Sequence, residues 1–155
     1  MADLFTLGYE GTDVQKFIKV LNARKMDTLV DVRDVPVSRK PGFSKNSLDA
    51  ACEAAGINYE HWPLLGCPKP IREEYRQDGD WAKYTRRYKK HLLTIENTLE
   101  DLSSRTLKER ICLVCFEADP RFCHRSYIAE AVQELLPGTV ELVHLTSTGL
   151  TAVPG

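Results

Sequence analysis

The sequence predicts a single three-layer α/β domain, with a mostly parallel sheet of about five strands and helices on both faces. Apolar runs of strand length alternate with amphipathic segments almost throughout the chain. The 155 residues, 43% of them hydrophobic, are enough for one compact core and too few for two ordinary domains. Alternation of strand and helix implies right-handed crossovers and therefore parallel strands. We assign residues 1–145 to the domain and 146–155 to a loose C-terminal tail.

Periodicity places the individual elements. We predict strands at residues 4–7, 28–32, 57–61, 111–116 and 140–145, and helices at residues 12–21, 48–55, 81–104 and 123–136. Thr12 and Gln15 have the spacing of a capping box at the start of the first helix, and Gly56 ends the second. Residues 62–80 contain three prolines and two glycines, and this irregular composition predicts a lid or substrate loop.

Composition and charge exclude several classes of protein. The net charge of −1 provides no overall attraction to nucleic acid or to an anionic membrane. The chain has no secretory start and no apolar run long enough to cross a bilayer, so we expect no membrane partner. Five cysteines, an odd number, argue against a secreted disulfide framework. We therefore expect a cytoplasmic protein, and the oligomeric state stays open.

Chemically reactive residues follow each of the first four predicted strands. Because ligands bind outside the carboxyl ends of parallel strands, we expect these residues to converge on one edge of the sheet. They are Tyr9 and Glu10 after the first strand, Asp31 and Arg33 at the second, His61 at the third, Cys115 and Glu117 at the fourth, and Cys123, His124 and Arg125 at the start of the next helix.

Four motifs, in order along the chain, carry a resemblance to a known family. They are G-Y-E-G at residues 8–11, D-V-R at 31–33, R-K-P-G-F-S-K at 39–45, and C-x-E-x-x-P-x-x-C-H-R from 115 to 125. Together they resemble the prokaryotic family called domain of unknown function 488, over roughly residues 5–145. The resemblance implies a small α/β fold with a shared polar site and implies no particular reaction. One departure is that Cys67 follows Gly66, where members of the family often have two adjacent glycines.

Cys123 is the strongest candidate for a reactive group. The first turn of a helix and the nearby Arg125 both favour a thiolate. The alternative is a small residue that packs against the sheet, since buried cysteine is common. Cys115, at the end of a buried strand, is equally compatible with a thiol in the site and with a core residue.

Cysteine spacing offers two candidate pairs or sets for a metal ion or a disulfide. Cys112 and Cys115 lie three apart on a strand and face opposite sides, so the pair cannot hold one ion. Cys115, Cys123 and His124 form a second candidate set for zinc, but adjacent residues of a helix rarely point at one centre. A disulfide between Cys115 and Cys123 is an equal alternative. We therefore predict no cofactor, with zinc the less favoured possibility. A phosphatase-like loop from Cys115 to Arg121 is disfavoured by its acidic residues and its proline.

These residues favour a small enzyme that binds an anionic ligand, carrying a phosphate or resembling a nucleotide. Glu117 or Glu10 is the candidate general base, and Cys123 and His124 are further catalytic candidates. We expect Arg33, Arg125, Arg39 and Lys45 to hold the anion, with Tyr9, Asp31, His61 and Cys115 around it.

Two other functions remain open. The first is a redox- or metal-responsive binding module that uses Cys115, Cys123 and His124. The second is a nucleic-acid accessory protein that uses the basic run at residues 83–90, although helical spacing places the tyrosines of that run in the core.

Overall fold

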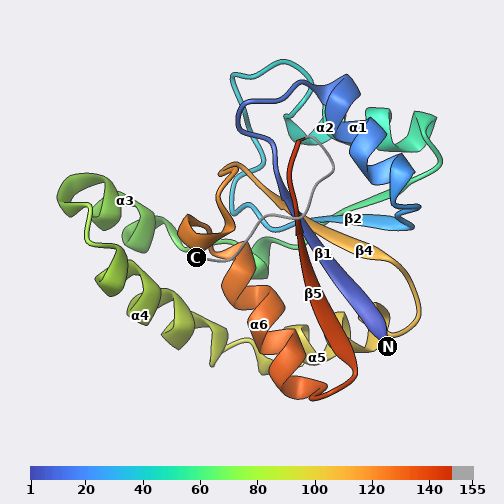
Figure 1. The fold of residues 1–155 in the computed structure, drawn as a ribbon. Coiled ribbons are helices and arrows are strands. Elements are labelled where there is room, and N and C mark those ends of the chain that lie inside the picture. The colour runs from blue at the N-terminus through green and yellow to red at the C-terminus, as the bar shows by residue number, and fades with distance from the viewer. Residues whose placement is uncertain (148–155) are drawn as a thin grey trace.

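Five parallel strands form the centre of the computed structural model, which describes residues 1–147 (Figure 1). They are β1 (Ala2–Gly8), β2 (Thr28–Asp31), β3 (Asn58–His61), β4 (Ile111–Cys115) and β5 (Val140–Leu145), in the order β3-β2-β4-β1-β5. Every pair of neighbours is parallel. The predicted fold class is therefore confirmed. Most of the predicted tail, residues 148–155, lies outside the described residues.

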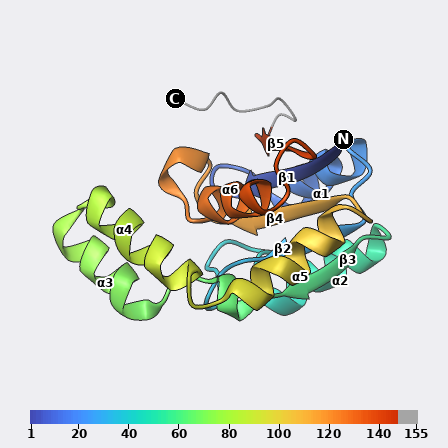
Figure 2. The same ribbon diagram turned by 90° about the horizontal axis from the view of Figure 1, so that it is seen from below.

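Helices cover both faces of the sheet (Figures 1 and 2). The first face carries α1 (Val14–Ala23) and α2 (Lys45–Ala54), and the other carries α5 (Glu96–Thr106) and α6 (Arg125–Leu135). A hairpin of α3 (Lys69–Asp78) and α4 (Trp81–Leu92) projects beyond the end of the sheet. Short 3-10 turns, η1 (Pro63–Leu65) and η2 (Pro120–Phe122), precede α3 and α6. No helix within residues 1–147 has both the length and the apolar character needed to cross a bilayer.

Two hydrophobic clusters pack on the two faces of the sheet, and β4 contributes to both. Cys112 and Val114 belong to the cluster beneath α1 and α2, whereas Leu113 and Cys115 belong to the cluster beneath α4, α5 and α6. The alternation follows from the two-residue period of a strand. It confirms that Cys112 and Cys115 point to opposite faces of the sheet.

Two predicted elements were wrong in the region between β3 and β4. Residues 62–80 form η1 and α3 in place of a loop, because Pro70 lies in the first turn of a helix, where no backbone donor is lost. The single helix predicted at 81–104 is two helices. The break lies at residues 93–95, where the backbone amide and the hydroxyl of Thr94 both donate to the carbonyl of His91.

Two predicted helix starts were also wrong. Asp13, not Thr12, is the N-cap of α1, and its carboxylate accepts a hydrogen bond from the Lys16 amide at 2.9 Å. The last helix begins at Arg125, because the turn at Pro120 leads into an extended Cys123 with φ −140° and ψ 139°. Cys123 therefore lies before the helix.

Candidate functional site

The carboxyl ends of β1, β2 and β4 open onto a cavity of about 350 Å³. The hairpin of α3 and α4 closes its other side. Its wall combines arginines, aromatic rings, thiols, a carboxylate and an imidazole: Tyr9, Arg33, Asp34, Val35, Val37, Cys67, Arg72, Tyr75, Arg76, Trp81, Tyr84, Cys115, Phe116, Glu117, Phe122 and His124. The structure thus brings together Tyr9, Arg33, Cys115, Glu117 and His124 from the predicted set.

A buried ion pair fixes one side of the cavity. The guanidinium of Arg33 donates to both carboxylate oxygens of Asp31, at 2.9 and 2.6 Å. Its remaining nitrogen donates to the Tyr9 hydroxyl at 3.2 Å and to the Phe43 carbonyl at 2.7 Å. Each guanidinium nitrogen therefore already has a partner, so Arg33 shapes the cavity wall more than it offers free donors.

Two residues of β3 support this ion pair from behind. The Tyr59 hydroxyl donates to Asp31, and burial followed by this hydrogen bond raises the pKa of Tyr59 well above its ordinary value. The Nε2 atom of His61 lies 2.7 Å from the Arg33 carbonyl. His61 is thus a neighbour of the site and does not line the cavity, and sequence reasoning did not identify Tyr59.

The loop that follows β4 is held by contacts from β1, from the turn that follows β1 and from α6. Gly8 allows it to approach, since a Cβ atom at that position would lie 1.8 Å from the Glu117 carbonyl oxygen. Glu10 accepts a hydrogen bond from the Ala118 amide at 3.0 Å. Arg125 donates to the carbonyls of Glu117 and Ala118, at 2.6 and 3.3 Å. Glu10 and Arg125 therefore position the loop from outside the cavity.

Two thiols and an imidazole meet at the floor of the cavity and directly behind it. The Nδ1 atom of His124 lies 3.8 Å from the sulfur of Cys115 and 3.9 Å from the sulfur of Cys123. Its other ring nitrogen, Nε2, lies 2.7 Å from the Val32 carbonyl oxygen. A carbonyl only accepts, so Nε2 carries a proton and Nδ1 is directed at the sulfurs. We call Cys115, Cys123 and His124 the thiol–imidazole centre; all three are buried.

The charges around the thiol–imidazole centre favour a thiolate at Cys123. Burial opposes ionisation, but a hydrogen bond from Cys115 and the positive charge of Arg125 outweigh it, and the pKa of Cys123 falls well below its usual value. The hydrogen bond to Cys123, followed by burial, raises the pKa of Cys115. Burial and then the Cys123 charge raise the pKa of Glu117 to about 7.

Aromatic rings form the wall opposite the sheet. Trp81 stacks on Tyr84 with ring centroids 4.4 Å apart, and its edge contacts include Tyr75 at 5.3 Å and Phe122 at 5.8 Å. Phe122 is about half exposed. These rings come from α3, α4 and η2, which sequence reasoning interpreted as loop or as core.

The cations of the cavity differ in how far they are already neutralised. Arg72 donates to Asp34 at 2.9 Å and to the Cys67 carbonyl at 3.1 Å. Arg76 lines the cavity and has no ion-pair partner among residues 1–147. Sequence reasoning did not identify Arg76, because residues 62–80 were expected to be irregular. Arg39 and Lys45, which were predicted to bind the anion, are exposed and do not line the cavity.

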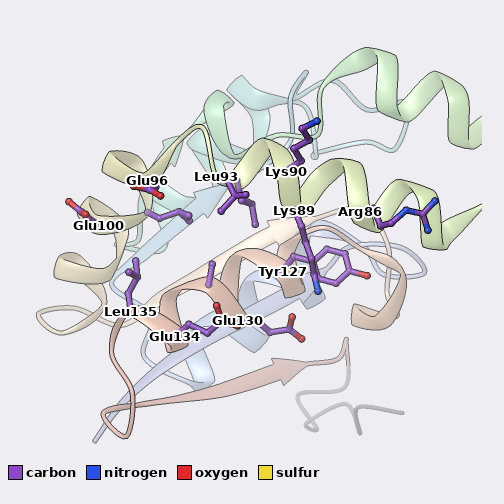
Figure 3. A pocket seen from close by; sticks show the side chains of 13 residues that line it. Arg86, Lys89, Lys90, Leu93, Glu96, Glu100, Tyr127, Glu130, Glu134 and Leu135 are labelled. Carbon is purple, nitrogen blue, oxygen red and sulfur yellow. The ribbon is translucent and has the colours of Figure 1, made fainter.

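A larger hollow of about 740 Å³ lies between α4, α5 and α6, away from the strand ends (Figure 3). Its floor is apolar and its rim carries charged residues such as Lys90 and Glu134. The hollow contains no thiol or imidazole. This hollow is larger than the cavity at the strand ends, but only the cavity at the strand ends has thiols and an imidazole in its lining. We therefore assign the candidate site to the smaller cavity.

Two of the five cations in the basic run at residues 83–90 form ion pairs within the protein. Lys83 forms ion pairs with Glu74 and Asp78, and Arg87 pairs with Glu74. Tyr84 and Tyr88 are buried, as helical spacing predicted. The buried tyrosines are therefore not available to stack on the bases of a nucleic acid.

The parallel sheet and the thiol–imidazole centre at its strand ends define a small α/β protein with a cysteine-containing polar site. The chain belongs to the family described as Domain of unknown function DUF488, whose family model matches residues 13–132. The resemblance to this family is therefore confirmed over residues 13–132, which contain three of the four sequence motifs, whereas G-Y-E-G at residues 8–11 lies before the match. No curated protein and no solved structure shows a significant match to the chain.

The departure from paired glycines at residues 66–67 has a structural explanation. A Cβ atom on Gly66 would lie 2.4 Å from the Cα atom of Asp34, so the close backbone approach occurs at the glycine that this chain keeps. Cys67 is buried and its residue lines the cavity, and burial raises the pKa of its thiol to about 11. Cys67 thus adds a neutral thiol to the cavity wall.

Proposed function

We propose that the protein is a small enzyme that binds an anionic ligand in the cavity at the strand ends and acts on it beside the thiol–imidazole centre. The observation that carries this proposal is the composition of the cavity lining. Arg72 and Arg76 approach the cavity from α3, while Cys115, Glu117 and His124 approach it from the end of β4 and the segment between β4 and α6. Cations that hold a ligand beside groups able to transfer protons or bond covalently are the usual components of a catalytic site.

The aromatic wall supports a ligand with a flat ring, as in a nucleotide. Trp81 and Phe122 line the same cavity as the arginines. Stacking against such rings binds a planar group, and an arginine fork binds phosphate or carboxylate oxygens. A nucleotide or another ring-bearing phosphate therefore matches both walls.

Position assigns roles to the groups at the cavity floor. Glu117 lines the cavity, and its Oε2 atom lies 3.6 Å from the Cys115 sulfur, so it is the candidate for proton transfer to or from the ligand. Cys123 is not part of the lining, which places its thiolate behind Cys115 and His124. The negative charge of Cys123 therefore affects a bound ligand indirectly, through Cys115 and His124.

Thermal shift with a panel of nucleotides and phosphorylated metabolites tests the proposal, because a true ligand stabilises the native state by mass action. We expect a stabilising compound whose effect is lost in Arg76→Ala and retained in Arg39→Ala, a matched arginine outside the cavity. Glu117→Gln is expected to abolish turnover of that compound with little change in the melting temperature. A flat panel, or equal losses in both arginine variants, would contradict the proposal.

A second candidate is a redox-responsive binding module, favoured by the shared approach of the two sulfurs to His124 Nδ1. Oxidation by a disulfide such as glutathione disulfide would remove two electrons from the Cys115 thiol and the Cys123 thiolate, release the proton of Cys115, form one disulfide and leave the oxidant as reduced thiols. Free thiols are counted in the folded protein before and after treatment with glutathione disulfide. A reversible loss of two thiols would favour the redox-responsive module. For either candidate we propose a reducing compartment such as the cytoplasm, because five cysteines, an odd number, do not suit a disulfide framework.

A further inference from the structure

We propose that Cys115, Cys123 and His124 bind a divalent metal ion of the zinc class at the floor of the cavity. This inference deepens the proposed function by naming the ion of its site. Two sulfurs and an imidazole nitrogen are the donor set that zinc prefers, and catalytic zinc sites keep three protein ligands and an open position.

The donor atoms are already gathered. The two sulfur atoms and Nδ1 of His124 lie within 4.8 Å of one another, and both sulfur-to-nitrogen distances are below 4 Å. In a tetrahedral site with bonds of about 2.0–2.3 Å, ligand atoms are separated by roughly 3.5–3.8 Å. Only a small inward movement separates the observed arrangement from coordination.

The surroundings of His124 match those of a metal ligand. Nε2 donates to the Val32 carbonyl at 2.7 Å, which leaves the lone pair of Nδ1 directed at the sulfurs. A second hydrogen bond of this kind fixes the tautomer and ring orientation of metal-binding histidines. An edge-to-face contact with Tyr88 also holds the imidazole ring, and the two ring centroids lie 5.2 Å apart.

Backbone geometry removes the objection that adjacent residues of a helix diverge. Cys123 is extended, with φ −140° and ψ 139°, and His124 turns into the helical region, with φ −63° and ψ −20°. This change of conformation between two neighbours lets both side chains reach the same point. Sequence reasoning disfavoured zinc because it placed Cys123 within the helix.

Accessibility and charge agree with an ion that faces the ligand. Cys115 and His124 line the cavity, and Glu117 lines it beside Cys115, with its Oε2 atom 3.6 Å from the Cys115 sulfur. Two thiolates would balance a divalent ion, and the Glu117 carboxylate would balance Arg125. Arg125 is fully buried and has no ion-pair partner among the described residues. Buried charges need such compensation.

The test measures metal on the whole chain. Reduced protein is incubated with excess Zn²⁺, passed through a desalting column and assayed by mass spectrometry of the elements. We expect one zinc per chain in the wild type and in Cys52→Ala, a buried cysteine of the opposite cluster, and loss of zinc in Cys123→Ser and His124→Gln. Zinc that is absent from the wild type, or retained in both site variants, would overturn the proposal.

A titration of the wild-type protein with Co²⁺ keeps the proposal testable where a variant fails to fold. Cobalt bound by two thiolates gives sulfur-to-cobalt charge-transfer absorption, which should saturate at one equivalent and be reversed by Zn²⁺. Absence of that absorption in folded, reduced protein would overturn the inference. Ligand stabilisation that persists in metal-free protein would leave the proposed function standing, whereas metal binding with a flat ligand panel would contradict only the proposed function.

Discussion

Asp31 and Arg33 are buried together, so the charge of each depends on the other for compensation. Replacing Asp31 with Asn leaves a buried guanidinium without its counter-charge, and removing one partner of a buried pair costs about 3–5 kcal/mol. Asp34→Asn is the matched control, since its pair with Arg72 is about one-third exposed and is expected to contribute less than about 1 kcal/mol. Urea unfolding of both variants checks the difference, and equal losses would contradict it.

Gly8 is required by the loop that carries Glu117. An alanine there would place its Cβ atom 1.8 Å from the Glu117 carbonyl oxygen, so the loop must move. We expect Gly8→Ala to cost about 1–3 kcal/mol and to expose Cys115, which then reacts faster with a thiol reagent such as Ellman's reagent.

Gly11→Ala is the control for this substitution. Its φ of +79° makes alanine strained, but no atom lies within 4 Å of the added carbon. It should therefore lower stability by about 1–2 kcal/mol without changing thiol reactivity. Equal reactivity of Cys115 in both variants would show that Gly8 does not position the loop.

The ion-pair network around Arg105 joins two elements, because it ties α5 to the edge strand β3. Arg105 donates two hydrogen bonds to Glu60, at 2.6 and 2.7 Å, and one to Glu109 at 2.7 Å. The hydrogen bonds to Arg105 lower the pKa of both Glu60 and Glu109. Carboxylates with lowered pKa contribute stability above their unfolded pKa, and this stability is lost as pH falls through the folded pKa.

Arg105→Gln is therefore expected to cost about 1 kcal/mol at neutral pH, a modest value because these side chains are partly exposed. The cost should shrink as pH falls below about 4.5, where the wild type also loses the network. Unfolding free energies measured from pH 7 to pH 3 test this. A cost that is constant over that range would show that Arg105 acts through packing alone.

Sequence patterns predicted strands better than helix ends. The strand from Val140 to Leu145 was predicted to the residue, because its apolar run stands between clear turn signals. The break near Thr94 was missed because apolar residues keep helical spacing on both sides of it and face the same cluster. The start of α6 was placed two residues early, and that small error hid the convergence of Cys123 and His124.

At the scale of the whole molecule, the site joins parts that differ in how well the sequence predicted them. The strand-end residues Tyr9, Arg33 and Cys115 were expected to meet, because parallel topology brings the carboxyl ends of strands to one edge. The opposite wall was expected only in part, because residues 62–80 were predicted as a lid or substrate loop, and neither Trp81 nor Arg76 was among the predicted site residues. Its position depends on how the hairpin of α3 and α4 packs, which no local pattern determines.

This hairpin is expected to be the least stable part of the domain. It projects beyond the sheet, α3 packs chiefly against α4, and Ile71 is the one buried residue of α3 (Figure 2). Segments with few buried apolar contacts open locally at low free energy. Amides of α3 should therefore exchange hydrogen with solvent faster than those of β1 and β4.

A compound that binds the cavity should slow exchange in α3 and α4, because both helices line it. Hydrogen exchange read by mass spectrometry tests both statements, and protection of α5 in place of α3 and α4 would place the ligand elsewhere.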